Sequence, residues 1–347
     1  MLSGLRPANW LRRPWKPLVF ANANFARIPA TQKIEEETIS GYVATRYYPT
    51  RIGETFQDRY QVVGKLGYGA TSTVWLARDM QHRRYVTLKI FIKCASMGKA
   101  LDDELKIYTR ISNTATSHPG RSAVRSLLDT FNIDGPEDKH QCLVHAPLFE
   151  SVWAFLHRNP IQRLPNIMLA FILQRLFLAL DYLHTECQVI HTDIKADNIM
   201  FEFSDESVLV DFEQGELQAP CPRKELDGRC IYVSRELTMP KQMGAPVLCD
   251  FDSAVIGGIE HLEDVQPNIY RAPEVILEVP WTESIDIWNV GCMMWDIFEG
   301  DSLFTGQDPE LHTYRSRAHL AEMISLLRAA GASFCRPRPT KPQILFL

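Results

Sequence analysis

The alternation of apolar and polar residues predicts a group of short strands in the first half of the chain. Residues 60–79 (YQVVGKLGYGATSTVWLARD) alternate like two strands joined by a tight turn, and residues 85–92 (YVTLKIFI) continue with a third. Residues 99–111 place apolar side chains at positions i, i+4 and i+7, which predicts an amphipathic helix. Residues 140–149 read as a further short buried strand that reaches a proline near its end.

The second half of the chain is predicted to be mainly helical. Residues 167–184 are apolar around much of a helical circumference, which is typical of a buried helix. Residues 282–299 form another strongly apolar stretch with an acidic residue near its start. A chain of 347 residues is long enough for two lobes with separate cores, at roughly 150 residues per domain.

Composition narrows the class of protein without identifying it. The net charge of −5 and an ordinary apolar content argue against a nucleic-acid binder and against a disordered chain. The eight cysteines are scattered with no CxxC pair, so we expect reduced thiols in an intracellular protein. No apolar run reaches the ~18 residues that suggest a membrane span, and we expect no membrane association.

The N-terminal segment is basic. Residues 1–34 contain six arginines and lysines and no acidic residue, until Glu35, Glu36 and Glu37 mark a change in composition. We expect residues 1–40 to be a disordered arm. An Arg-rich, acid-free segment also resembles a mitochondrial targeting peptide, although its prolines interrupt the helix that such a signal needs.

Candidate chemistry is concentrated in residues 189–200, VIHTDIKADNIM. Asp193 is followed two residues later by Lys195, and Asn198 comes three residues after that. Phosphoryl transfer needs these residue types close together, because a carboxylate orients the attacking hydroxyl, a cation neutralises the moving phosphoryl group and an amide oxygen holds a metal. A chance loop can carry the same three residues, so the motif depends on its partners elsewhere in the chain.

This stretch resembles the catalytic loop of protein kinases. The form HTDIK, with Thr192 where most kinases carry Arg, is similar to the family of SR-protein kinases, as is the run at residues 41–61. The resemblance covers residues 41–327 and implies an α+β, bilobal protein-kinase-like fold with a small β-rich N-lobe and a larger helical C-lobe. Its domains would be the N-lobe and hinge (41–149), the C-lobe (150–327) with a spacer insert (202–246), and an atypical tail (328–347).

The resemblance also implies the roles of the loop residues. Asp193 would be the catalytic base, Lys195 the cation at the γ-phosphate and Asn198 a metal ligand. Without the usual Arg at Thr192, regulation by phosphorylation of the activation loop is less expected.

The ATP site is expected in the first lobe. Gly67 and Gly69 would let backbone N–H groups approach the phosphates, and Lys89 on the third strand would pair with Glu104 of the helix. Thr87 stands where the family pattern has Ala against the adenine, and His145 falls at the gatekeeper position, where we expect a packed core histidine. The full set of expected ATP-binding residues is Leu66, Gly67, Gly69, Ser72, Val74, Lys89, Glu104, Ala146, Leu148 and Met200.

Two aspartates compete for the second metal-ligand position. Asp211 follows the base at the short separation that ordinary kinases use, whereas Asp250 lies much farther along. We choose Asp250, because the Ala-Pro-Glu motif that ends at Glu274 then follows it as an activation segment would. Asp211 remains the alternative. Asp252 departs from the family pattern, which has Gly at this position.

Two acidic residues are expected to be structural. Asp286 would fix the backbone of the catalytic loop, and Glu274 usually pairs with an Arg from the last helices of the large lobe. Residues 328–347 lose helical periodicity, so we expect those helices, and that Arg, to be missing. Asp252 and the altered C-terminus favour the alternative of a pseudokinase that binds partners without turnover. A third interpretation is the unstable product of an incorrect gene model.

The predicted function is that of an ATP- and Mg²⁺-dependent serine/threonine protein kinase that acts as a monomer on protein substrates. The family implies Arg-Ser-rich substrates and an acidic docking groove, for which Asp301 matches one acid and Asp308 and Glu310 lie near. Arg315 and Arg317 bring positive charge to the same region, which would repel such a peptide. We expect no direct nucleic-acid binding, and a location in the cytoplasm, the nucleus or both, with mitochondria as the alternative.

Overall fold

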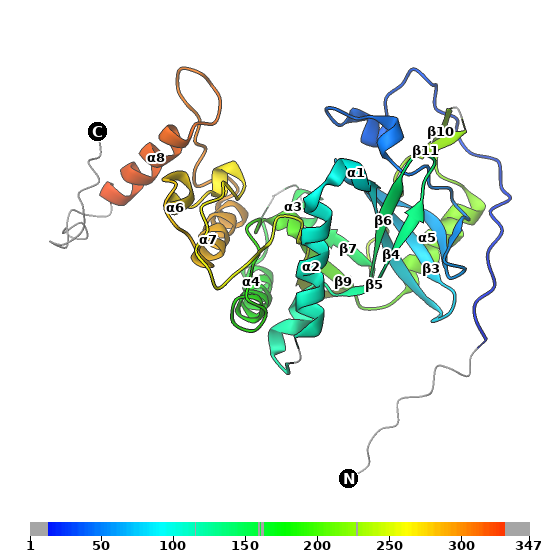
Figure 1. Ribbon diagram of the computed structural model, residues 1–347, viewed down its shortest axis with the longest axis horizontal. Coiled ribbons are helices and arrows are strands. Elements are labelled where there is room, and N and C mark those ends of the chain that lie inside the picture. The colour runs from blue at the N-terminus through cyan, green and yellow to red at the C-terminus, as the bar shows by residue number, and fades with distance from the viewer. Residues whose placement is uncertain (1–12, 115, 159, 161–162, 227, 330–347) are drawn as a thin grey trace, which may run out of the picture.

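The computed structural model describes residues 13–114, 116–158, 160, 163–226 and 228–329. A strand-rich region and a helical region lie side by side (Figure 1), which confirms the predicted α+β fold with two lobes. The small lobe is built on a six-stranded antiparallel sheet in the order β1-β2-β3-β4-β6-β5. Its strands are β1 (Thr55–Phe56), β2 (Tyr60–Tyr68), β3 (Ser72–Asp79), β4 (Arg84–Lys93), β5 (Leu127–Asp134) and β6 (Lys139–His145).

The alternating pattern places apolar side chains inside this sheet. Val62, Trp75, Val86, Leu88 and Val144 are all buried in one cluster, as period-2 alternation requires. Helix α2 (Lys99–Asn113) follows the short α1 (Cys94–Met97) and lies beside the sheet in Figure 1. The predicted strands and helix of the first half are therefore confirmed.

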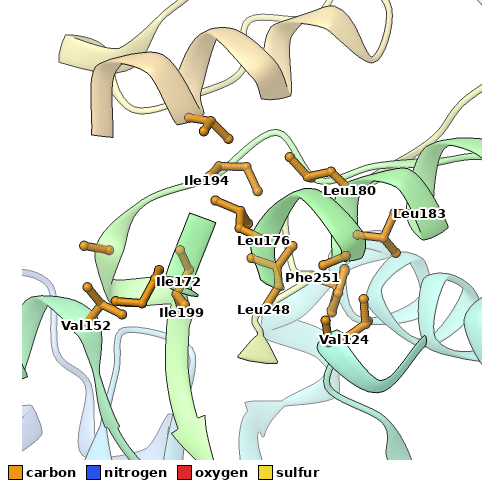
Figure 2. Packing of buried hydrophobic residues seen from close by; sticks show 14 of the residues in the cluster. Val124, Val152, Ile172, Leu176, Leu180, Leu183, Ile194, Ile199, Leu248 and Phe251 are labelled. Carbon is orange, nitrogen blue, oxygen red and sulfur yellow. The ribbon is translucent and has the colours of Figure 1, made fainter. Parts of the chain in front are cut away.

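The large lobe is organised around α4 (Asn166–Asp181), which continues into a π-helical turn, Tyr182–Cys187. One side of α4 is buried, and Figure 2 shows its residues Ile172, Leu176 and Leu180 packed in the core. The stretch Asn166–Cys187 is long and apolar enough to cross a membrane, but the core helix of a globular lobe meets the same test, and its buried side places it here in that role. The other helices are α3 (Val152–Arg158), α6 (Pro273–Ile276), α7 (Ser284–Glu299) and α8 (Ser316–Ala329).

Small antiparallel sheets flank the candidate catalytic loop. The order β12-β9-β7 combines β7 (Leu148–Ser151), β9 (Ile199–Phe203) and β12 (Met243–Leu248), and β8 (Val189–Ile190) pairs with β13 (Val255–Ile256). The chain leaves the three-stranded sheet at the end of β9 and returns along β12, so the predicted spacer is an excursion between paired strands.

The spacer folds onto the small lobe. It contains α5 (Ser207–Gln218), β10 (Arg223–Leu226) and β11 (Arg229–Tyr232), and Phe212 of α5 packs in one cluster with Val63 and Leu76 of the sheet. A Cβ added to Gly64 would lie 2.8 Å from a ring atom of Phe212, so the close contact requires glycine there.

The N-terminal arm does not behave as expected. Disorder was predicted for residues 1–40, but from Arg13 onward the chain lies against the small lobe, and residues 1–12 fall outside the described part. The Trp15 N–H donates to the Met80 carbonyl (2.8 Å), and the Ile28 N–H donates to the Arg223 carbonyl of the spacer (3.0 Å). The prediction is therefore wrong for residues 13–40, because these contacts with distant parts of the chain leave no local pattern.

Three consecutive glutamates join the arm, the sheet and the spacer, and we call Glu35, Glu36 and Glu37 the acidic clasp. Glu35 accepts a hydrogen bond from the Ser234 hydroxyl of the spacer (2.7 Å), and Glu37 pairs with Lys224 of β10 (2.7 Å). Glu36 pairs with Lys65 of β2, whose side chain is 1% exposed. A buried lysine must have such a partner, because an unpaired ammonium is costly to bury.

Lys65→Met is expected to lower the free energy of unfolding by several kcal/mol, on the order of 3–5, because it leaves a buried carboxylate at Glu36 without its cation. Thermal melting of the full chain measures the loss. Lys33→Met removes an exposed lysine of the same arm and should leave the melting temperature unchanged.

The double variant Glu36→Gln with Lys65→Met should recover part of the lost stability, since it removes both charges of the pair. Equal melting temperatures for Lys65→Met and the parent chain would show that the acidic clasp does not stabilise the fold.

Candidate active site

The hydrophobic core and the carboxylate of Asp286 hold the backbone of the candidate catalytic loop in place. Ile194 is fully buried and points into the core in Figure 2, so the loop is anchored between Asp193 and Lys195. The buried carboxylate of Asp286, at the start of α7, accepts hydrogen bonds from the backbone N–H groups of His191 and Thr192 (both 2.8 Å). These contacts are those expected of a residue that fixes the loop backbone.

Thr192 shows why the loop needs such support. Its φ of +66° is rare for a β-branched residue, so the conformation must be imposed by its surroundings. The Thr192 hydroxyl donates to the Ser253 carbonyl (2.8 Å), which ties the loop to the segment after Asp250. The position that usually carries Arg thus has a local, uncharged role in joining two segments.

The three candidate catalytic side chains converge. The Lys195 ammonium lies 2.7 Å from Oδ2 of Asp193, and the Asn198 amide Nδ2 donates to the same oxygen (2.8 Å). Burial would lower the pKa of Lys195, but the hydrogen bond and charge of Asp193 raise it overall, so the ammonium stays charged. Because Asn198 uses its nitrogen here, its Oδ1 is left to accept a metal.

The structure distinguishes the two aspartates. Leu248 of β12 pairs with Ile199 of β9, and the Cys249 N–H donates to the Asn198 carbonyl (2.8 Å), which brings Asp250 next to the catalytic loop. Asp211 lies exposed on α5 in the spacer. The geometry therefore favours Asp250 as the partner of Asn198.

Lys89 bridges the two lobes. Its ammonium lies 3.0 Å from Glu104 of α2 and 3.0 Å from Oδ1 of Asp250. Burial would lower the pKa of Lys89, but the two carboxylates raise it above its ordinary value. Burial likewise would raise the pKa of Asp250, but Lys89 holds it below its ordinary value. The predicted pair of Lys89 and Glu104 is thus formed, with Asp250 as a third member.

The residues after Asp250 differ in burial. Phe251 is fully buried between Tyr108 of α2 (ring centroids 5.3 Å apart) and His191 of the loop (5.1 Å), so its packing couples the helix to the catalytic loop. The side chain of Asp252 keeps exposed surface, but partial desolvation of its carboxyl group by the surrounding site, together with the charge of Asp250, raises its pKa. The glycine expected here is thus replaced by a carboxyl group that is more easily protonated.

A cavity of about 480 Å³ lies between the lobes next to these residues. Five of the predicted ATP-binding residues line it, namely Leu66, Gly67, Val74, Leu148 and Met200. Ala146 is exposed directly after β6, at the hinge. The turn between β2 and β3 holds the other two phosphate-loop positions, where the Gly69 N–H donates to the Ser72 carbonyl (2.8 Å).

Sequence reasoning missed other residues of this cavity. Arg125 and the segment 235–237 of the spacer also line it. The spacer could not be placed there from sequence, because its position depends on contacts such as that of the Arg235 N–H with the Lys65 carbonyl (3.0 Å). Arg125 could not be identified from the sequence either. Its place at the cavity depends on the pairing of its neighbour Val124 with the distant Leu248.

Gly67→Ala is expected to weaken ATP binding by about tenfold without changing the melting temperature. A Cβ at Gly67 meets no protein atom within 4 Å, so the fold should accept it, whereas it would occupy the space where a phosphate approaches the backbone. Titration with Mg·ATP measures the affinity. Gly291→Ala, on α7 outside the cavity, is the matched control, because a Cβ there also meets no protein atom within 4 Å, and it should keep the parent affinity.

The donor set fits Mg²⁺. Among the described residues no group of three or more His, Cys, Asp or Glu side chains is placed to hold a metal by itself. Mg²⁺ usually takes one or two protein oxygens and completes its shell with waters and substrate phosphates. Oδ1 of Asn198 and the carboxylate of Asp250 would provide those oxygens, on two segments joined by the hydrogen bond from the Cys249 N–H to the Asn198 carbonyl.

The Arg that usually pairs with Glu274 was expected to be missing, and within the described part of the chain Glu274 forms no ion pair. Its carboxylate receives a long hydrogen bond from the Ser284 hydroxyl (3.4 Å), and it borders a largely apolar cavity between α7 and α8. α8 ends at Ala329, close to the point where helical periodicity was expected to stop, and residues 330–347 lie outside the described residues.

Comparison with known proteins agrees with this geometry. A family model described as the protein kinase domain matches residues 60–341. The chain therefore belongs to the protein kinase family, and its relatives make it a serine/threonine protein kinase similar to the SR-protein kinases.

Three relatives show how far the similarity extends. A serine/threonine protein kinase of Aspergillus fumigatus is 41% identical over 94% of this chain and 79% of its own length. A serine/threonine-protein kinase SRPK of Physarum polycephalum is 30% identical over 86% of this chain and 74% of its own. SRSF protein kinase 3 of Mus musculus is 37% identical over 48% of this chain and 29% of its own.

Proposed function

We propose that the chain transfers the γ-phosphate of Mg·ATP to serine hydroxyls in arginine-rich protein substrates. Protein kinase activity follows from the family, and the names of the Physarum and mouse relatives support the narrower substrate class. In this proposal Asp193 orients the serine hydroxyl and accepts its proton, while Lys195 neutralises charge on the transferred group. Asn198 and Asp250 would hold Mg²⁺, which supplies further positive charge at the phosphates.

The observation that carries the substrate class is a second cavity, of about 420 Å³, directly beside the catalytic loop. We call it the acidic groove, because Asp197, Asp296 and Asp301 line it together with Lys195. Asp197 and Asp301 are exposed, whereas Asp296 accepts a hydrogen bond from the Tyr270 hydroxyl (2.6 Å) and burial raises its pKa. Two accessible carboxylates thus line the cavity that also contains Lys195, the partner of Asp193, and there they would attract the basic side chains of a peptide.

The positive charges of Arg315 and Arg317, which argue against an arginine-rich substrate, are partly neutralised. Arg317 pairs with the buried carboxylate of Asp308 (2.6 Å), so the two cancel and Asp308 is not available to a peptide. Asp308 and Glu310 do not line the acidic groove, whereas Asp301 does. Asp301 is the one of the three acids considered from sequence that lines the groove, which supports its proposed role in binding substrate.

The test compares an Arg-Ser repeat peptide with an Ala-Ser peptide of equal length, using the full chain and Mg·ATP. We expect a KM at least tenfold lower for the Arg-Ser peptide, and a severalfold rise of that KM in Asp301→Asn and in Asp197→Asn. Glu310→Gln, an exposed acid outside the groove, is the matched control and should change nothing. Equal turnover of both peptides would remove the proposed substrate class and leave the kinase activity intact.

A further inference from the structure

Tyr47, in the segment before β1, contacts the turn between β2 and β3. Its side chain is 5% exposed, and its hydroxyl lies 2.9 Å from the Ala70 carbonyl and 3.1 Å from the Gly69 carbonyl. Both carbonyls belong to residues 67–72, which we call the glycine loop. Within the described part of the chain, Tyr47 is the one residue whose side chain forms a hydrogen bond with this loop.

The Tyr47 hydroxyl donates to both carbonyls, because a carbonyl oxygen can only accept. Burial raises the pKa of Tyr47 above its ordinary value and the charge of Glu36 adds to this effect, so the hydroxyl keeps its proton. The ring packs against Tyr42 (centroids 5.1 Å apart), and the Tyr47 carbonyl accepts a hydrogen bond from Arg229 of β11 (2.7 Å). Tyr47 is therefore itself held in place, partly by the spacer.

The geometry of the peptide bond links this contact to the N–H groups of the loop. In a trans peptide the N–H group points opposite to the C=O group of the same unit, and no described peptide bond is cis. Because the carbonyls of Gly69 and Ala70 point toward Tyr47, the N–H groups of Ala70 and Thr71 point away from it. Neither of these N–H groups donates to another described residue. Successive backbone N–H groups that share one direction are suited to bind an anion such as a phosphate.

Tyr47 and the nucleotide cavity lie on opposite faces of the sheet. On β3, Trp75 contacts Tyr232 of the spacer on one face, whereas its neighbour Val74 lines the cavity on the other. Lys65, the cross-strand partner of Trp75, reaches the acidic clasp on the face of Trp75. Tyr47 lies beside this clasp, whose charge acts on its hydroxyl. N–H groups that point away from Tyr47 therefore point toward the side of the cavity.

We propose that Tyr47 is a positioning residue that holds the glycine loop in the conformation that receives the phosphates of ATP, and that Arg229 keeps Tyr47 in place. A glycine-rich loop has much conformational freedom to lose when it binds a ligand, and a loop that is ordered beforehand loses less. The inference rests on the proposed transfer of phosphate from Mg·ATP, and it adds a connection from the spacer to the phosphate site.

The test compares Mg·ATP with adenosine, which carries the base and the sugar but no phosphate. Tyr47→Phe removes the hydroxyl and keeps the ring, so the Kd of Mg·ATP should rise about fivefold, which is the effect of losing about one hydrogen bond. The Kd of adenosine should stay unchanged, because adenosine does not use the loop. Arg229→Met should raise the Kd of Mg·ATP by about twofold and also leave that of adenosine unchanged. Calorimetric titration of the full chain measures these values.

Tyr42→Phe is the matched control. The Tyr42 hydroxyl is buried and has no hydrogen-bond partner among the described residues, so its removal leaves the ring contact with Tyr47 and both hydrogen bonds to the loop in place. This variant should bind Mg·ATP and adenosine as tightly as the parent chain. Melting curves of each variant without nucleotide verify that the fold is intact.

The outcomes separate this inference from the proposed function. An unchanged Kd of Mg·ATP in folded Tyr47→Phe would overturn the inference, and so would an equal loss of affinity for adenosine, which indicates a change of the whole cavity. If Tyr47→Phe did not fold, the same comparison in Arg229→Met would decide. None of these results affects phosphate transfer by the parent chain, whereas failure of the folded parent chain to bind Mg·ATP would overturn the proposed function itself.

Discussion

Asp193→Asn is expected to reduce the rate of phosphate transfer by about 10²- to 10⁴-fold, the range that a positioned general base contributes. The amide has the shape of the carboxylate but cannot take the proton of the serine hydroxyl. ATP affinity should change little, because Asp193 does not line the nucleotide cavity. Single-turnover transfer of labelled phosphate to a serine peptide, with ATP titration alongside, measures both effects.

The control for this variant is Asp134→Asn, at the exposed end of β5, where a carboxylate is removed without touching the site. It should retain full activity. If Asp193→Asn kept more than a tenth of the parent rate, another group would have to be the base, and the convergence of Lys195 and Asn198 on Asp193 would be structural only.

Local pattern was enough to predict most elements of the fold. Strands β2, β3, β4 and β6 and helices α2, α4 and α7 form where apolar periodicity predicted them, because each buries a regular side of its own, whereas β1 and β5 were not predicted. The catalytic loop was also readable, since Asp193, Lys195 and Asn198 lie within a few residues of one another. These features were predictable because the residues that form each of them lie close together in the sequence.

Features that depend on distant contacts were not predictable in this way. The arm was expected to be disordered, but residues 13–40 lie against the sheet and the acidic clasp joins that arm to β2 and β10. The glutamates marked only a change of composition in the sequence. Their partners Lys65 and Lys224 are far away along the chain, and no local pattern links them.

Strand register was a further feature that the sequence did not predict. Thr87 and His145 were each noticed from sequence, as a small departure from the family pattern and as a packed core histidine. Their cross-strand pairing, and the pairing of Leu127 with the same histidine, depend on the register of the whole sheet, which no local pattern sets.

Asp250→Asn is expected to lower phosphate transfer by at least about 10²-fold, because it removes the carboxylate proposed to hold Mg²⁺ and a bound metal ion contributes several kcal/mol to charge stabilisation. The fold should survive, since Lys89 keeps its second carboxylate partner, Glu104. Transfer rates measured over a range of Mg²⁺ concentrations should show that the variant needs far more metal than the parent chain.

Asp211→Asn is the matched control. Asp211 was the alternative candidate for the metal ligand, and it lies exposed on α5. Its rate and its Mg²⁺ dependence should equal those of the parent chain. The opposite result, with Asp211→Asn inactive and Asp250→Asn active, would require the spacer to supply the metal ligand. That arrangement conflicts with the backbone hydrogen bond between Cys249 and Asn198, which fixes Asp250 beside the loop. The two variants therefore test the paired path of β9 and β12 as well as the metal site.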